Sequence, residues 1–151
     1  MSDSFTSINV HIIFHIKSGG VPMEENHLPR IFDYIGGTIR SMSGISFIVG
    51  GRSDHIHILC SAPVSISLSD FVRGIKANTS RWIKRIDGRY SDFSWQAGYG
   101  AFSVSESNKD IVIKYIKNQK EHHNNQSAFE EFRLFIQKHG FDVNDIGRIE
   151  N

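Results

Sequence analysis

The sequence has few of the residues that build a covalent framework or a membrane span. Cys60 is the single cysteine among 151 residues, which excludes a disulfide framework and a four-cysteine zinc site. No apolar run approaches the roughly 18 residues of a membrane helix, and the first residues lack the basic and apolar pattern of a signal peptide. A P-loop is also absent, which argues against a nucleotide cofactor. We therefore expect a cytoplasmic protein without a membrane segment.

Net charge is also small, but the charges are unevenly distributed. The formal net charge is +1, yet residues 73–120 carry ten lysines and arginines against four acidic residues. A basic region of this kind is typical of a surface that meets nucleic-acid phosphates, although a solvated helix face has the same composition. Length and composition predict a single domain over 1–151, with a core over 8–121 and a helical extension over about 126–151.

Hydrophobic periodicity predicts the order of the secondary structure. The period of strands is found over 8–17, 45–50, 54–61 and 93–104, the last interrupted by Gly98 and Gly100. Helical spacing is found over 28–42, 67–86, 109–120 and 127–139. We expect a tight turn at Gly50–Ser53 between the second and third strands, and Ser67 with Asp70 resembles a capping box.

The order strand, helix, strand, strand, helix, strand, followed by two helices, indicates the fold class. It is the split βαβ pattern of an α+β, ferredoxin-like domain with an antiparallel sheet. In this pattern two helices cover one face of the sheet and leave the other open. The functional residues are therefore expected on the open face.

Two histidines share one face of the third strand. Because side chains alternate along a strand, His55 and His57 point to the same side, and Ile56 and Ile58 point to the other. Two imidazoles about 6–7 Å apart can bind a divalent metal from one side, or they can be polar residues of an exposed face. His11 and His15 lie on the neighbouring first strand and would shape the same site if their face is the open one.

A tyrosine and a glutamine share one face of the helix over 109–120. Tyr115 and Gln119 are four residues apart, so they are neighbours on that face. Gln119 offers a neutral oxygen as a third metal ligand, and the Tyr115 hydroxyl would attack a phosphate that a metal polarises. The alternative is an aromatic residue at the edge of the core beside a surface glutamine.

The combination resembles the HUH single-tyrosine transposases, the insertion sequence 200/605 group and their REP-associated relatives. The opening strand VHIIFHIK, the strand DHIHILC, the segment WQAGYGAFSVS and the helix YIKNQ look like that family in order and spacing. The resemblance implies that His55, His57 and Gln119 bind a divalent metal, Mg²⁺ or Mn²⁺, and that Tyr115 is the nucleophile. The implied activity is nicking and rejoining of single-stranded DNA through a 5′-phosphotyrosine intermediate.

The resemblance also implies partners. We expect single-stranded DNA, with hairpin ends, as the substrate, and a homodimer whose active sites are each shared between two chains. The polar stretch over 105–108 would let the tyrosine helix swing to the partner. The residues expected to contact DNA are Lys17, Arg73, Lys76, Arg81, Lys84, Arg85, Lys114 and Lys117.

Two other functions remain open at this point. A replication-initiator-type HUH nickase would use the same residues, and a non-catalytic nucleic-acid-binding module would keep only the fold. Metal-dependent cleavage of a labelled single strand separates both enzymes from the binding module.

Overall fold

Four antiparallel strands form one sheet. The computed structural model describes residues 3–119 and 127–141. The strands are β1 (Asn9–His15), β2 (Ile45–Arg52), β3 (His55–Ser61) and β4 (Gly100–Val104), and their order in the sheet is β2-β3-β1-β4. Every neighbouring pair is antiparallel. This arrangement confirms the predicted α+β, ferredoxin-like fold.

Two helices pack on one face of the sheet and form the main core. They are α1 (Leu28–Ser41) and α2 (Leu68–Ile86), and the predicted cap is present because the Ser67 side chain accepts a hydrogen bond from the Asp70 amide at 3.1 Å. Apolar residues of β1 and β3 meet the buried sides of these helices, and Cys60 lies among them.

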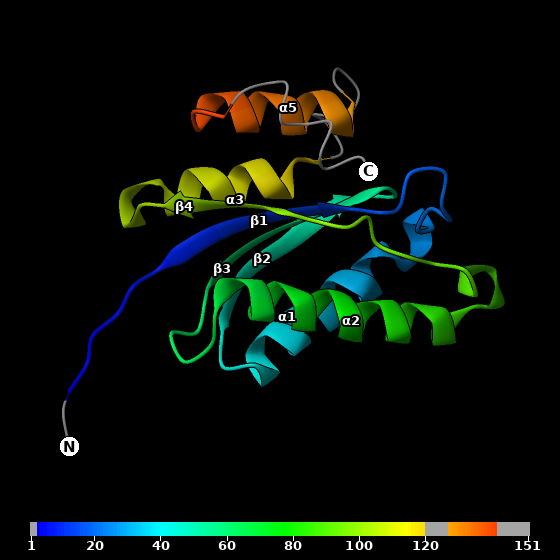
Figure 1. Ribbon diagram of the computed structural model, residues 1–151, viewed down its shortest axis with the longest axis horizontal. Helices are drawn as coiled ribbons and strands as arrows, with labels where there is room; N and C mark the ends of the chain where they lie inside the picture. Colours follow the sequence, from blue (N-terminus) through cyan, green and yellow to red (C-terminus); the bar gives the residue numbers. More distant parts are fainter. Residues whose placement is uncertain (1–2, 120–126, 142–151) are drawn as a thin grey trace.

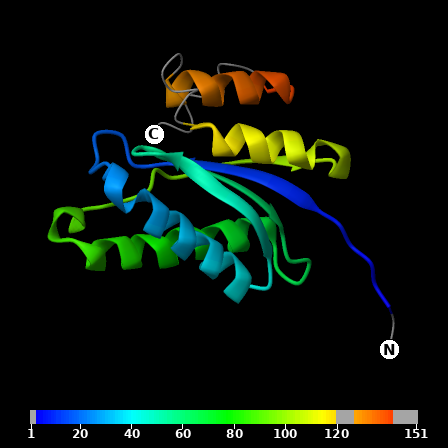
Figure 2. The same ribbon diagram turned by 180° about the vertical axis from the view of Figure 1, so that it is seen from behind.

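Two further helices, α3 (Lys109–Lys117) and α5 (Ala128–Lys138), cover the opposite face (Figure 1). The view from behind shows the same layers, with α1 and α2 on one side of the sheet and α3 and α5 on the other (Figure 2). The prediction of an open face is therefore wrong. The apolar side chains of α5, led by Phe132 and Ile136, bury Ile13 and Phe102 of that face, because a helix with an apolar stripe must cover it.

Two glycines let these helices approach the sheet closely. Gly50 of β2, His57 of β3, Ile13 of β1 and Gly100 of β4 are successive cross-strand neighbours in one row. A Cβ atom on Gly50 would lie 2.8 Å from the Ile116 carbonyl oxygen of α3, and one on Gly100 would lie 2.8 Å from the Phe132 ring of α5. His57 is therefore in the middle of a row whose two end residues have no side chain, which leaves room for α3 and α5.

The boundaries of two predicted features differ from the observed ones. Gly50 and Gly51 lie inside β2, and the chain turns at Ser53–Asp54. Gly50 makes room for α3, whereas Gly51, at φ +143°, lies against the backbone of His55 on β3. The strand expected over 93–104 pairs regularly only from Gly100, and before that Trp95 makes an isolated bridge to Ile16. Gly98, at φ +89°, interrupts the strand as a glycine in the left-handed region does.

The remaining elements are short. The 3-10 segments η1 (Glu25–His27), η2 (Gly88–Tyr90) and η3 (Glu106–Asn108) precede α1, follow α2 and precede α3. Residues 120–126 and 142–151, which include Lys120 and both ends of the predicted extension, lie outside the described residues. In the part of the chain that is described, no helix has the length and apolar character to cross a membrane.

Candidate active site and metal centre

The histidine pair lies on β3 as its period predicts. His55 and His57 point to the face under α3 and α5, their ring centroids are 5.1 Å apart, and each side chain is only 1% exposed. The two histidines are buried because α3 and α5 cover this face. The pair is therefore buried rather than part of the exposed polar face that the sequence left open as an alternative.

Each histidine is held from behind by a second side chain. The carboxylate of Asp54 lies 2.7 Å from Nδ1 of His55, and Nε2 of His11 lies 2.8 Å from Nδ1 of His57. A contact to Nδ1 fixes the direction of the ring and leaves Nε2 on the far side. Both Nε2 atoms therefore face the space between β3, α3 and α5.

Gln119 reaches this space from the residues that follow α3. Its side chain is 2% exposed, and its Oε1 lies 3.0 Å from Nε2 of His55. The amide nitrogen of Gln119 donates a hydrogen bond to Oε1 of Glu131 at 3.0 Å. The structure thus brings all three predicted ligands, His55, His57 and Gln119, into one place, with a carboxylate among them.

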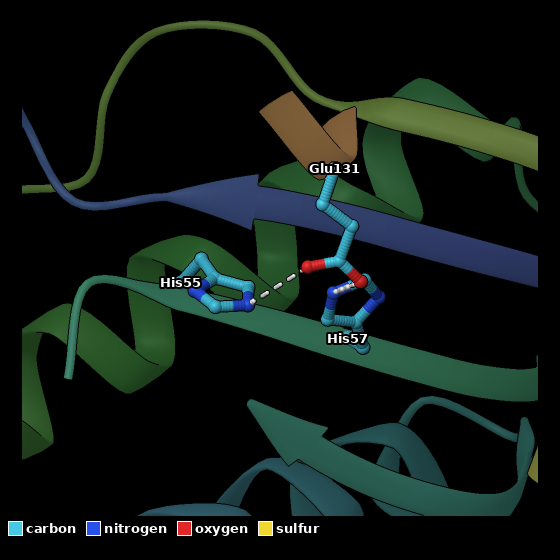
Figure 3. A group of neighbouring side chains, drawn as sticks. All are labelled: His55, His57 and Glu131. Atoms are coloured by element: carbon cyan, nitrogen blue, oxygen red, sulfur yellow. Dashed lines mark ion pairs between the residues drawn. The ribbon is translucent and has the colours of Figure 1, made fainter. Parts of the chain in front are cut away.

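Glu131 on α5 is the residue that the sequence analysis missed. Figure 3 shows its carboxylate between the two histidines, with Oε1 3.3 Å from Nε2 of His57 and Oε2 3.8 Å from Nε2 of His55. Burial raises the pKa of this carboxyl group to about 7, although the nearby His55 acts in the opposite direction. Its one signal in the sequence is an acidic residue on the apolar stripe of the helix, four positions before Phe135.

These donors suit a divalent ion. The nearest ligand atoms of His55, His57 and Glu131 lie within 4.8 Å of one another. The Asp54 carboxylate only accepts hydrogen bonds, so in its neutral form the His55 ring would carry its proton on Nδ1 and direct the Nε2 lone pair at Oε1 of Gln119. Two acceptors that converge at 3.0 Å have the separation of neighbouring ligands around one ion with bonds of about 2.1 Å. The residues present therefore fit a metal.

Tyr115 lies next to this centre. Its ring is 5.9 Å from that of His57, between centroids, and its hydroxyl donates a hydrogen bond to Oε1 of Glu131. Glu131 therefore contacts both the tyrosine and the predicted ligands. Tyr115 and Glu131 also line a cleft of about 320 Å³ between α3 and α5, whose outer wall includes Leu134 and Lys138. The tyrosine can thus be reached from outside the protein, whereas the histidines lie deeper.

The tyrosine and histidines that meet here belong to the same chain. The segment before α3 is held in place, because Glu106 accepts a hydrogen bond from Asn9 at 2.8 Å and pairs with Lys109 at 3.1 Å. A shared site would need this helix to exchange between two chains. Among the described residues β4 pairs with β1 on one side only, and a strand edge of this kind could pair with a second copy. A homodimer with shared sites stays a prediction.

The predicted DNA-contacting residues fall into two layers. Lys114 and Lys117 are exposed on α3, in the same layer as Tyr115, and Lys17 is exposed just beyond β1. The other five are on α2, behind the sheet: Arg73, Lys76, Arg81, Lys84 and Arg85. The five residues on α2 therefore cannot contact the phosphates beside Tyr115.

Three of the α2 residues have partners within the fold. Lys76 donates to the carbonyl oxygens of Gln96 and Gly98 at 2.7 and 2.8 Å, and burial lowers its pKa. Its ammonium group holds the loop before β4, so we withdraw Lys76 as a DNA contact. Arg73 pairs with Asp70 at 2.8 Å, and Arg81 donates to Asn78. Both of these pairs are on the surface, where such contacts are weak.

Comparisons with known proteins identify a family and a fold. The sequence profile of the IS200-like transposases matches residues 4–119, a stretch that ends at Gln119 and excludes α5. No curated protein matches the chain in sequence.

Two solved structures share the fold. A candidate transposase from Deinococcus radiodurans R1 is 18% identical, with a TM-score of 0.59 over 79% of this chain and 98% of the other. A REP-associated tyrosine transposase, bound to a REP hairpin, is 13% identical, with a TM-score of 0.54 over 96% of this chain and 79% of the other. At these identities the likeness concerns the fold.

Proposed function

The chain belongs to the IS200-like transposase family, and from this premise we propose that it is a metal-dependent single-strand DNA transposase that works through a 5′-phosphotyrosine intermediate. The observation that carries the proposal is the meeting of Tyr115, Glu131 and the histidine pair, which come from α3, α5 and β3. A hydroxyl nucleophile with a proton acceptor beside it, next to a group of metal ligands, is the arrangement that phosphoryl transfer needs.

The proposed nucleophile is the Tyr115 hydroxyl. Its oxygen attacks the phosphorus of a phosphodiester, the bond from phosphorus to the 3′-oxygen breaks, and this oxygen leaves as a 3′-hydroxyl once it has taken up a proton. The phosphate stays on the 5′-oxygen and becomes bonded to the tyrosine. A second 3′-hydroxyl reverses the step, so the bond energy is conserved and no nucleotide cofactor is needed.

Glu131 is the proposed acceptor of the phenolic proton. A tyrosine hydroxyl has an ordinary pKa near 10, so it needs a base in contact with it. The Glu131 carboxylate already accepts the Tyr115 hydrogen bond, and its raised pKa, about 7, makes it a stronger base than an exposed carboxylate. Its loss should therefore slow adduct formation even when metal is saturating.

His55, His57 and Gln119, with Glu131 beside them, are the residues that would hold the metal. An Mg²⁺ or Mn²⁺ ion there would polarise the phosphate and stabilise the charge that develops on its oxygens. Asp54 keeps the His55 imidazole turned toward that place. Carboxylate and amide oxygens suit both ions, and the imidazoles favour Mn²⁺ over Mg²⁺.

The proposed substrate is a single strand that carries a hairpin. A solved relative in fold is described with a REP hairpin bound, and the basic residues of this chain lie in two layers, as noted above. We propose that Lys114, Lys117 and Lys17 contact the strand near Tyr115. Lys84 and Arg85, with the weakly paired Arg73 and Arg81, would then contact a more distant part such as the hairpin.

One experiment tests the function directly. The protein is incubated with end-labelled single strands that contain hairpins, with Mn²⁺ or with a chelator, and covalent adducts are separated under denaturing conditions. We expect an adduct with the unmodified protein and Mn²⁺, and none with Tyr115→Phe, which loses one oxygen but keeps the ring. Tyr99→Phe is the matched control and should form the adduct normally.

Three results would contradict the proposal. An adduct that persists in Tyr115→Phe would remove the nucleophile assignment. DNA binding by the unmodified protein without cleavage, at any metal concentration, would instead indicate a non-catalytic nucleic-acid-binding module. Products that are nicked but never rejoined to a second 3′-hydroxyl would favour the replication-initiator type of nickase.

The predicted sharing of sites is tested by mixing. Tyr115→Phe and His57→Ala are each expected to be inactive. If a dimer shares its sites between chains, mixed dimers contain one site with both substitutions and one with neither, and cleavage returns. If each site forms within one chain, every site keeps one substitution, and the mixture stays inactive after confirmed subunit exchange.

A further inference from the structure

His11 is the buried side chain nearest to the proposed metal ligands that has no role in the reaction described above. It lies on β1 opposite Leu59, while Ile13, two residues further along, is opposite His57. His11 is therefore the diagonal neighbour of His57 on the same face of the sheet, which is within reach of a ring. The two ring centroids are 5.1 Å apart, and the His11 side chain is 2% exposed.

The contact between the two rings involves one nitrogen from each. Nε2 of His11 and Nδ1 of His57 are 2.8 Å apart. A neutral imidazole has one N–H donor and one acceptor nitrogen, so this hydrogen bond contains a single proton, which belongs either to His57 or to His11. If it belongs to Nδ1 of His57, then Nε2 of His57 keeps its lone pair. If it belongs to His11, Nε2 of His57 carries the proton and cannot bind a metal.

The two ligand histidines are supported in different ways. Asp54 can only accept, so it permits one tautomer of His55, and Asp54 itself is half exposed. His57 has a neutral ring behind it, deep under α5, where the edge of the Phe135 ring packs on His11 at 5.1 Å between centroids. A carboxylate in this position would add a buried charge next to an aromatic ring, which is costly. A second imidazole accepts the same proton without that charge.

We propose that His11 is a positioning residue for the metal site: it accepts the Nδ1 proton of His57 and so directs the Nε2 lone pair of His57 at the ion. This inference rests on the proposed function, because it assumes that His57 binds the metal. His11 does not touch the metal or the DNA in this role. Its contribution is to hold one tautomer and one orientation of the ring that does.

The test measures metal binding rather than activity alone. Mn²⁺ is titrated calorimetrically into the full chain without DNA. His11→Phe keeps a planar ring but has no nitrogen, and we expect its dissociation constant for Mn²⁺ to rise by about 10- to 100-fold, the usual effect of losing the support of a ligand. His11→Gln retains an acceptor oxygen and should restore most of the affinity, to within about threefold of the parent.

A matched control is available on the other side of the protein. His27 also has a ring nitrogen in a short contact, 2.6 Å from the Tyr90 hydroxyl, but far along the chain from the ligands and next to α1. His27→Phe should leave the Mn²⁺ affinity unchanged. Cleavage adds a second readout, because a positioning role predicts that His11→Phe regains close to the parent rate at saturating Mn²⁺.

Several outcomes would overturn the proposal. Unchanged Mn²⁺ affinity in His11→Phe would do so, as would equal losses in His11→Phe and His11→Gln. A rate that stays low at saturating Mn²⁺ would instead place His11 in the cleft beside Tyr115, in contact with substrate. If the unmodified protein binds no Mn²⁺, the metal site of the proposed function fails first, and this proposal fails with it.

A measurement on the unmodified protein avoids any question of misfolded variants. In the nitrogen-15 spectrum of the Mg²⁺-saturated chain, the ring proton of His57 should be found on Nδ1. The same proton should show a coupling across the hydrogen bond to Nε2 of His11. A proton on Nε2 of His57 in that state would rule out the positioning role, whatever the variants do.

Discussion

The two faces of the sheet are built from alternate residues of the same strands, yet they differ in the side chains that they bury: one carries the main apolar core, and the other a smaller apolar cluster beside the histidines. Under α1 and α2 the β1 and β3 side chains are apolar, as Ile12 and Ile58 show, and both are fully buried. Under α3 and α5 the same strands present His11, His15, His55 and His57, and Glu131 is buried against the pair. Burial is therefore similar on the two faces, but the chemistry is not.

The difference indicates that one face mainly stabilises the fold and the other carries the functional site. Apolar burial on the α1 and α2 face stabilises the fold by about 25 cal/mol for each Å² removed from water. The opposite face buries polar groups, which stabilise little and must be satisfied by one another. Such buried titratable groups are typical of functional sites. We therefore expect neighbouring residues of β3 to respond in opposite ways to substitution.

The largest effect is expected at His57. His57→Ala removes a proposed ligand, and we expect adduct formation to fall by at least about 10³-fold, more than the 10- to 100-fold loss typical of a supporting residue. The free energy of unfolding should fall by about 1–2 kcal/mol, because the buried contacts to His11 and Glu131 are lost. Adduct gels and urea unfolding measure the two quantities. If His57→Ala strongly lowers the free energy of unfolding but its folded fraction cleaves normally, the proposed difference between the two faces is wrong.

Ile58, the next residue, should show the reverse pattern. Ile58→Ala leaves a cavity in the main core and should lower the free energy of unfolding by about 3 kcal/mol. Mn²⁺ affinity, measured on the folded protein in the cold, should remain that of the parent. Urea midpoints and calorimetry provide the two values, and a joint loss of both would show that the faces are coupled.

The pH dependence of stability should come from the polar face. In metal-free protein the raised pKa of Glu131, about 7 against an ordinary value near 4.5, is a consequence of burial. The stability that its neutral form contributes is present below about pH 4.5 and is lost as the pH rises through 7, a fall of about 1–3 kcal/mol. Glu131→Gln should remove this fall from the curve of unfolding free energy against pH. Because the lowered pKa of the buried His11 adds a slope of opposite sign to both curves, identical curves for the parent and Glu131→Gln would contradict the assignment.

Gly50 allows α3, the helix that carries Tyr115, to lie close to β2. Gly50→Ala places a methyl group 2.8 Å from the Ile116 carbonyl oxygen, so α3 must shift away from β2. We expect a loss of about 1–2 kcal/mol in stability and a larger fractional loss of cleavage, because α3 carries Tyr115. Gly88→Ala, where nothing lies within 4 Å of the new atom, is the matched control. Equal behaviour of the two variants would mean that α3 is not held by this contact.

The smallest effects are expected from the exposed basic residues. Each lysine that meets a phosphate contributes about 0.7 to the slope of log binding constant against log salt for single strands. Lys114→Ser and Lys117→Ser should each lower this slope for plain strands. Lys84→Ser should lower it only for strands that carry a hairpin, because α2 is behind the sheet. Slopes that change alike for both kinds of DNA would remove the distinction between the layers.

Much of the fold could be predicted because its elements have clear periods. The alternation in β1 and β3 and the capped stripe of α2 depend on neighbours a few residues apart, which are visible in the sequence. The common face of His55 and His57 follows from the same alternation. The placement of Gln119 near His55 agrees with the resemblance, which links the strand to the helix across 64 positions.

The part of the site that could not be predicted depends on a helix outside the recognised stretch. The family match ends at Gln119, and α5 begins at Ala128. Glu131 shares a helix with Phe132 and Ile136, and its neighbours in sequence indicate an ordinary amphipathic helix. Only the docking of that helix shows that its one inward acidic side chain reaches the histidines.

By itself the sequence determined the strands and helices, their order, and the side of each strand on which the histidines lie, because these depend on local periodicity and on the alternation of side chains. The tertiary structure alone decided that the second face is closed, that His11 stands behind His57, and that Glu131 meets Tyr115. The last two contacts join residues 46 and 16 positions apart. The contact of His11 with His57 arises from the pairing of β1 with β3. The contact of Glu131 with Tyr115 and the closure of the second face arise from the packing of α3 and α5 over two glycines, and no period within one element encodes where a separate helix will pack.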